Sequence, residues 1–114
     1  LNEFFISPKI NKNTKTNFLA YPVIIKTNKF FSRKKIQIYL ENCGIQTRPI
    51  FSGNLLRHPA FNFLISKRNK LKYFKNSDYI MKNGLLIGCH QGLRYKDIKF
   101  IHKKIQEFMK DQVK

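Results

Sequence analysis

The amino-acid sequence predicts a small α/β domain of the two-layer α+β type, in which a short, mainly antiparallel sheet is covered by helices. With 114 residues, the chain suits one domain. Short runs rich in β-branched and aromatic residues alternate with segments of helical periodicity, the pattern that places helices against a sheet. Apolar residues make up 42% of the chain, enough for a modest core. A chain this short buries only roughly two-thirds of its unfolded surface, so we expect marginal stability unless it packs on something else.

A polar connector and a buried strand come first. Residues 7–17 are polar and lack periodicity, which predicts an extended connector. Residues 18–26, FLAYPVIIK, predict a strand, and Pro22 favours an edge position or a strand start because proline has no donor N–H. The chain begins with Leu1, and its first six residues look like the end of a structured element. We therefore expect a piece of a longer chain.

The clearest helix follows, over residues 32–43. Ser32 is placed to accept hydrogen bonds from the free N–H groups of the first turn, and Phe31 and Ile36 occupy the positions of a hydrophobic staple. Gly44 ends the helix, because glycine adopts the left-handed conformation at little cost. The spacing i, i+3, i+4, i+7 predicts one buried face, made of Ile36, Tyr39, Leu40 and Cys43.

The second half of the chain predicts two strands and two helices. In order, its segments are a strand at 44–51, a basic surface loop at 66–76, a short helix at 77–84 capped by Ser77 or Asp78, a buried strand at 85–89, a turn at 90–94 and a helix from about Tyr95 to Asp111. In the last helix, Asp97 in the first turn and Lys110 in the final turn suit the helix macrodipole. We expect its core face to consist of Ile98, Ile101, Ile105 and Phe108.

The chain is strongly basic, with 23 Lys and Arg against six Asp and Glu and a formal net charge of +17. A basic domain can bind nucleic acid by neutralising phosphates. The lysines are scattered, however, and Lys predominates over Arg, the residue that favours bidentate base contacts. Lys, Asn, Ile and Phe are also the residues that an AT-rich genome over-supplies. We therefore prefer codon bias as the source of the charge and keep a basic nucleic-acid-binding module as an alternative.

The spacing of reactive residues disfavours several classes of site. The sequence has no metal-binding motif, no glycine motif for phosphate and no GxSxG frame, and its six acids leave a serine nucleophile without an evident partner. Cys43 and Cys89 do not make a disulfide framework, which favours a reduced, cytoplasmic location. No apolar run approaches the ~18 residues of a membrane span, and no signal-peptide pattern is present, so we expect no membrane partner.

The most informative stretch is residues 47–59, TRPIFSGNLLRHP, which is too polar for a core strand and too apolar for a plain loop. Pro49 keeps Arg48 extended, and Arg57 and His58 follow a Gly–Asn break. Two guanidinium groups, an amide and an imidazole suit an anionic, polyhydroxylated ligand, because arginine grips carboxylate or phosphate bidentately. The alternative is a loop between elements whose arginines pair with acids elsewhere in the fold. The residues alone favour neither interpretation.

A resemblance to a known protein family adds to the interpretation of residues 47–59. Residues 44–61, GIQTRPIFSGNLLRHPAF, resemble the C-terminal domain of the sugar 3-dehydratases in the DegT/DnrJ/EryC1/StrS family. The family pattern has a Thr–Arg pair, an aromatic residue, Gly–Asn, and a basic or amide residue before Pro and a second aromatic residue. It falls here on Thr47, Arg48, Phe51, Gly53, Asn54, His58, Pro59 and Phe61. NFLAYPVIIK and SDYIMKNGLLIGCHQGL resemble two further family segments, so the resemblance extends from about residue 4 to residue 109.

The resemblance implies the small C-terminal domain of a fold-type I, pyridoxal-phosphate-dependent enzyme. Residues 1–17 would connect residues 18–114 to a large domain that holds most of the cofactor, pyridoxal phosphate or pyridoxamine phosphate. The substrate would be a CDP- or GDP-4-keto-6-deoxyhexose that loses its C3 hydroxyl in deoxysugar and O-antigen biosynthesis. The small domain would form one wall of the substrate cleft and carry no catalytic residue. The candidate substrate-binding residues are Arg48, Ser52, Asn54, Arg57, His58 and His90.

An aminotransferase of the same family is the alternative. In the dehydratases a histidine replaces the lysine that forms the Schiff base in the aminotransferases, and this position lies outside the sequence. The resemblance further implies a homodimer and, for CDP sugars, a separate reductase. We expect residues 1–114 to be inactive and poorly stable when expressed alone.

Overall fold

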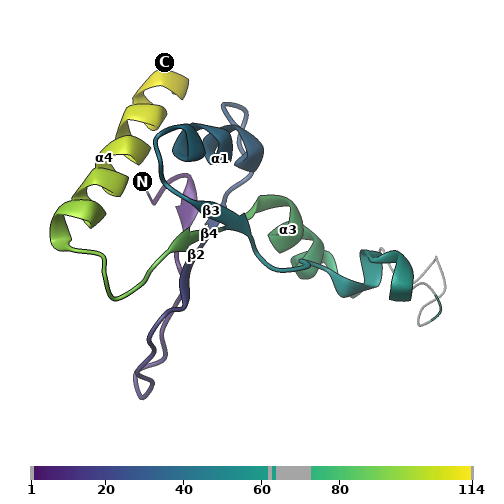
Figure 1. The fold of residues 1–114 in the computed structure, drawn as a ribbon. Coiled ribbons are helices and arrows are strands. Elements are labelled where there is room, and N and C mark those ends of the chain that lie inside the picture. The colour runs from purple at the N-terminus through teal and green to yellow at the C-terminus, as the bar shows by residue number, and fades with distance from the viewer. Residues whose placement is uncertain (1, 62, 64–72, 114) are drawn as a thin grey trace.

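An antiparallel sheet of four strands lies at the centre of the computed structural model, which describes residues 2–61, 63 and 73–113 (Figure 1). The strands are β1 (Phe5–Ile6), β2 (Ala20–Ile25), β3 (Thr47–Pro49) and β4 (Gly84–Gly88), in the order β1-β2-β4-β3. Every neighbouring pair is antiparallel. The prediction of a small antiparallel sheet is therefore confirmed. The stretch predicted as a connector, 1–17, contributes β1 to this sheet.

Three α-helices surround the sheet within the described residues. They are α1 (Arg33–Asn42), α3 (Lys75–Asn83) and α4 (Tyr95–Gln112). Two short 3-10 helices, Leu55–Arg57 and Pro59–Phe61, precede α3 and project from the body, as does the loop between β1 and β2 (Figure 1). These projections raise the radius of gyration to 16.2 Å, against about 13 Å for a compact domain of this length.

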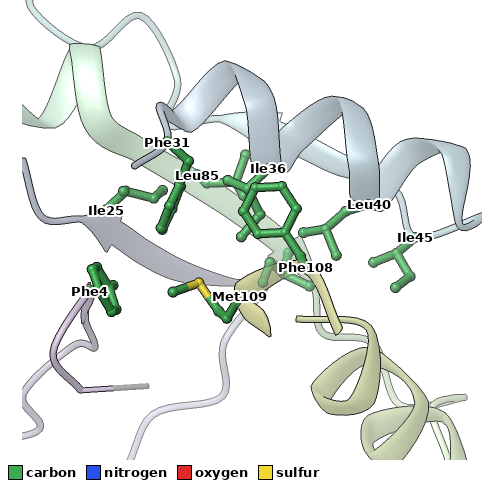
Figure 2. Close-up of a cluster of buried hydrophobic side chains, with 10 residues drawn as sticks. Phe4, Ile25, Phe31, Ile36, Leu40, Ile45, Leu85, Phe108 and Met109 are labelled. Atoms are coloured by element: carbon green, nitrogen blue, oxygen red, sulfur yellow. The ribbon is translucent and has the colours of Figure 1, made fainter. Parts of the chain in front are cut away.

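One hydrophobic cluster joins α1 and α4 to a single face of the sheet (Figure 2). Its buried members are Phe4, Ile25, Phe31, Ile36, Leu40, Ile45, Leu85, Ile87, Phe108 and Met109. The rings of Phe31 and Phe108 meet edge to face, with centroids 5.2 Å apart, and so connect the start of α1 to α4. Successive strand residues point to opposite faces, so Pro22, Ile24 and Leu86 lie on the other face, where they are half-buried.

α1 begins and ends where the sequence predicts. The Oγ of Ser32 accepts a hydrogen bond from the Lys35 N–H at 3.3 Å, and Gly44 follows the helix with a φ of 76°. Ile36 and Leu40 are buried, at 1% and 0% exposure, on the predicted face. Pro22 is also placed as predicted, since β1 pairs with β2 only at residues 24 and 25 and leaves the proline at a local edge.

α3 and α4 depart from the predictions in two respects. α3 begins at Lys75, and Phe74 rather than Ser77 or Asp78 precedes it as the N-cap residue. In α4, Ile98 is 53% exposed, so the predicted core face is wrong at this position, because the buried contacts of α4 are made in its C-terminal turns. Most of the predicted basic loop 66–76 lies outside the described residues.

Candidate functional site

The loop that follows β3, residues 50–58, carries most of the predicted site residues and turns sharply against α3. The Gly53 N–H donates to the carbonyl oxygen of Ile50 at 3.0 Å, which closes a turn through Phe51 and Ser52. Gly53 has a φ of 64°, and a Cβ atom at this position would overlap Met81 of α3. Only glycine therefore allows the loop to lie this close to the helix.

Asn54 fixes the conformation of the loop through hydrogen bonds of its side-chain amide. Its side chain is buried, and its Oδ1 accepts a hydrogen bond from the Leu56 N–H at 3.1 Å, at the start of the first 3-10 helix. Its Nδ2 donates to Oδ1 of Asp78, in the first turn of α3, at 2.8 Å. An amide with partners at both ends can be buried at little cost, and it has only one favourable orientation.

Arg57 completes this cluster through a bidentate ion pair with Asp78. Its Nε and Nη2 donate to Oδ1 and Oδ2 of Asp78 at 2.9 and 2.5 Å. The hydrogen bonds from Arg57 and Asn54 lower the pKa of the Asp78 carboxyl from 3.8 to about 2. The same hydrogen bond and charge raise the pKa of the Arg57 guanidinium. Asp78 therefore remains ionised over the physiological range and ties both ends of the 54–57 segment to α3.

These contacts bear on the two interpretations of the 47–59 stretch. For Arg57, the structure provides the partner acid that the loop interpretation requires. Asn54 is likewise engaged within the fold. Contact of either residue with a ligand stays a prediction, because the bidentate pair uses two of the three guanidinium nitrogens of Arg57.

Arg48 lies on the sheet rather than in the loop. It is exposed on β3, where it pairs with Leu86 of β4 on the face opposite the hydrophobic cluster. Glu41, the residue before the last of α1, fixes the start of β3 by accepting from the Thr47 N–H and hydroxyl at 2.7 and 2.6 Å. These hydrogen bonds, followed by the charge of Arg48, lower the pKa of the Glu41 carboxyl. The start of β3, next to Arg48, is therefore anchored to α1 through the buried Thr47.

The remaining candidates occupy two different ends of the sheet. Ser52 and His58 are exposed in or beside the loop, and the His58 Nδ1 accepts from the Ala60 N–H at 3.4 Å. His90 is also exposed and accepts from the Gly92 N–H at 3.1 Å. The loop leaves the sheet where Pro49 pairs with Leu85, whereas His90 follows the far end of β4. Five of the six candidates therefore lie on β3 or on the loop directly after it, and His90 lies beyond the other end of β4.

Sequence reasoning missed two residues that shape this region. Asp78 was predicted only as a helix cap, and Phe51 only as part of the family pattern, although its backbone adopts a φ of 42°. The composition contains a signal for Asp78, since a stretch with two arginines, 47–59, in a chain with six acids favours pairing with whichever acid lies near. No comparable signal predicts the backbone conformation of Phe51.

Other chemistries find little support in the described part of the chain. No group of three or more His, Cys, Asp or Glu residues could hold a metal ion among the residues described. Cys43 is half-buried and Cys89 is exposed, and both are free thiols. None of the helices described is long and apolar enough to cross a membrane.

Comparison with known proteins shows which family the chain belongs to. A family model described as the DegT/DnrJ/EryC1/StrS aminotransferase family matches residues 1–106. The chain belongs to this family. Two curated family relatives are each 27% identical to it: the lipopolysaccharide biosynthesis protein RfbH of Salmonella typhimurium and the GDP-4-keto-6-deoxy-D-mannose 3-dehydratase of Escherichia coli O55:H7. Each alignment covers 93% of this chain, but only 24% and 28% of the respective relatives.

Solved structures of DegT/DnrJ/EryC1/StrS proteins agree with this assignment. The E. coli GDP-4-keto-6-deoxy-D-mannose-3-dehydratase with bound hydrated PLP matches with a TM-score of 0.66 and 26% identity, over 89% of this chain and 25% of that one. A family aminotransferase from Brucella abortus has a TM-score of 0.72 at 15% identity, over 94% and 26% of the two chains, which shows the shared fold alone. The chain thus spans about a quarter of the length of these relatives and adopts the expected fold.

The acids of the described residues do not by themselves fit a PLP site. Such a site pairs a Schiff-base lysine, or its substitute, with an acid or arginine at the pyridinium nitrogen. Four of the six acids are engaged by their own chain: Glu41 with Thr47, Asp78 with Arg57 and Asn54, Asp97 with Arg94, and Glu107 with Lys104. The other two, Glu3 and Asp111, lie near the two ends of the described chain. No cofactor step is therefore assigned to these residues.

Proposed function

We propose that this chain is the C-terminal part of a PLP- or PMP-dependent nucleotide-sugar 3-dehydratase. The reaction is removal of the C3 hydroxyl from a CDP- or GDP-4-keto-6-deoxyhexose, in deoxysugar or O-antigen biosynthesis. The observation that carries the proposal is the pair of relatives named as 3-dehydratases, one acting on a GDP sugar and one on a dTDP sugar, which align with 93% and 90% of this chain. The similarity to RfbH supports a place in lipopolysaccharide biosynthesis.

In this proposal, residues 18–114 form one wall of a substrate cleft whose cofactor lies in another part of the enzyme. Arg48, Ser52 and His58 are exposed and offer a cation, a hydroxyl and an imidazole to the sugar nucleotide. Asn54 and Arg57 hold the loop, and Arg57 presents its remaining guanidinium nitrogen. His90, at the other end of the sheet, becomes the weakest of the six candidates. The complete enzyme would be a cytoplasmic homodimer, with a separate reductase if the substrate is a CDP sugar.

The test is the reaction of the complete enzyme with CDP- and GDP-4-keto-6-deoxyhexoses in the presence of PLP and an amino donor, with the separate reductase added for the CDP sugar. A 3-dehydratase releases a product without the C3 hydroxyl, which mass spectrometry distinguishes from the unchanged sugar. Histidine at the cofactor-anchoring position would agree with this result. A product that keeps all its hydroxyls and gains a 4-amino group would overturn the dehydratase proposal.

That second outcome defines the alternative function, a nucleotide-sugar aminotransferase. The description of the matching family as an aminotransferase family favours it. Lysine at the anchoring position, together with transfer of the donor's amino group to the sugar, would establish it.

A further inference from the structure

Phe51 is an exposed aromatic residue in a strained backbone conformation. Its side chain is 80% exposed, and its φ of 42° is the only positive φ of a non-glycine residue in the ranges 2–61, 63 and 73–113. A bulky side chain is unfavourable in this region and remains there only where the surrounding structure enforces it. Because the ring is exposed, packing within this chain does not explain why a phenylalanine occupies this position.

The contacts on both sides of Phe51 enforce its conformation. Before it, Ile50 packs directly on the first residue of β4, because a Cβ atom at Gly84 would overlap Ile50. After it, Gly53 lies against Met81 of α3, and the buried Asn54 is hydrogen-bonded to Asp78. Phe51 and Ser52 thus form the tip of a turn whose backbone is fixed at both ends, and the exposed Phe51 side chain extends from this tip.

We propose that Phe51 contacts the ligand and that its ring stacks on a flat ring face of the nucleotide sugar, an inference that rests on the proposed function. Aromatic side chains stack on any nucleobase, and a turn whose backbone is fixed in advance loses little entropy on binding. Its exposed neighbours Arg48, Ser52 and His58 offer a cation and hydrogen-bonding groups, which suit a diphosphate and hydroxyls. These polar neighbours favour a polar ligand with a flat ring over an apolar protein surface.

The experiment compares Phe51→Ala, Phe51→Tyr and Phe51→Gly in the complete enzyme. Steady-state kinetics give KM and kcat for the nucleotide sugar, and calorimetry gives Kd for the nucleoside diphosphate alone. We expect Phe51→Ala and Phe51→Gly to raise KM about tenfold and to change kcat less, whereas Phe51→Tyr stays within about threefold of wild type. A matching rise in Kd for the nucleoside diphosphate identifies the base as the stacked ring, and an unchanged Kd identifies the hexose.

Phe63→Ala is the matched control, because Phe63 is also 80% exposed and lies beyond the same loop. We expect this variant to bind and turn over substrate like wild type. The inference is overturned if Phe51→Ala keeps the wild-type KM, if Phe63→Ala is equally impaired, or if Phe51→Ala acts by dissociating or unfolding the enzyme. If the wild-type enzyme neither binds nor converts a nucleotide sugar, the proposed function fails, and this inference fails with it.

Discussion

Arg57 and Asp78, which are 21 positions apart in the sequence, form a bidentate ion pair that fastens the loop after β3 to the first turn of α3. Asn54 donates to the same carboxylate. One acid therefore orders a loop that contains an arginine, an amide and an imidazole. Because the side chains of Arg57 and Asp78 are only 33% and 25% exposed, the pair is screened less than a surface salt bridge.

The first prediction concerns the Asp78 carboxylate. Asp78→Ala should lower the free energy of unfolding by about 1–3 kcal/mol, because it leaves the buried Nδ2 of Asn54 without its acceptor. Asp78→Asn should cost less, since an amide oxygen can still accept one of the hydrogen bonds. Urea unfolding of residues 1–114, in a stabilising osmolyte such as sucrose, measures both changes. Asp111→Asn, at an exposed acid in the last turn of α4, is the control, and an equal loss there would contradict a specific role for Asp78.

The second prediction is the pH dependence that Asp78 confers. The pKa of the Asp78 carboxyl is 3.8 in the absence of these contacts and about 2 in the folded protein. At a pH between these two values, the unfolded chain therefore binds more protons than the folded protein. The stabilisation is thus fully present above about pH 5 and is lost as the pH falls towards 2. The shift corresponds to at most about 2.5 kcal/mol, and to about 1–2 kcal/mol after allowance for the exposed quarter of the side chain. The stability difference between wild type and Asp78→Asn should therefore shrink with acid, and a difference constant from pH 5 to pH 2 would refute this assignment.

The third prediction separates backbone strain from steric overlap in two glycines. Gly44 and Gly53 both have positive φ, but a Cβ atom at Gly44 meets nothing within 4 Å, whereas at Gly53 it would overlap Met81. Gly44→Ala should cost about 1 kcal/mol, from strain alone. Gly53→Ala should cost about 2–4 kcal/mol, because the loop must also move away from α3. Equal costs in urea unfolding would show that the loop does not lie against α3.

The elements that the sequence predicts well are those whose signals are local. Ser32, Ile36, Leu40 and Gly44 define the start, face and end of α1 within thirteen residues, and the structure agrees at each position. Periodicity also identifies the helix that contains Ile98. It does not show how far a helix extends beyond the core, and for this reason Ile98 is exposed.

The sequence predicts where the candidate site lies but not what each of its residues does. The mixture of polar and apolar residues after β3 identifies the loop. The sequence does not, however, distinguish an arginine that pairs with an acid from one that faces a ligand. Asp78 shows the reason: an acid at a helix start can cap the helix or reach a distant partner, and only the fold decides. The φ of Phe51 likewise depends on contacts of its neighbours with α3 and β4.

The last prediction concerns the core of α1. Leu40 is fully buried in the cluster between α1, α4 and the sheet (Figure 2). Ile38 in the same helix is 50% exposed. Leu40→Ala should cost about 2–5 kcal/mol through lost apolar contact and the cavity that remains, and Ile38→Ala about 1 kcal/mol or less. Because a domain this small has little stability to lose, Leu40→Ala should leave residues 1–114 unfolded while Ile38→Ala leaves them folded. Circular dichroism and NMR shift dispersion distinguish the two states, and a folded Leu40→Ala variant would show that the core is more stable than its size suggests.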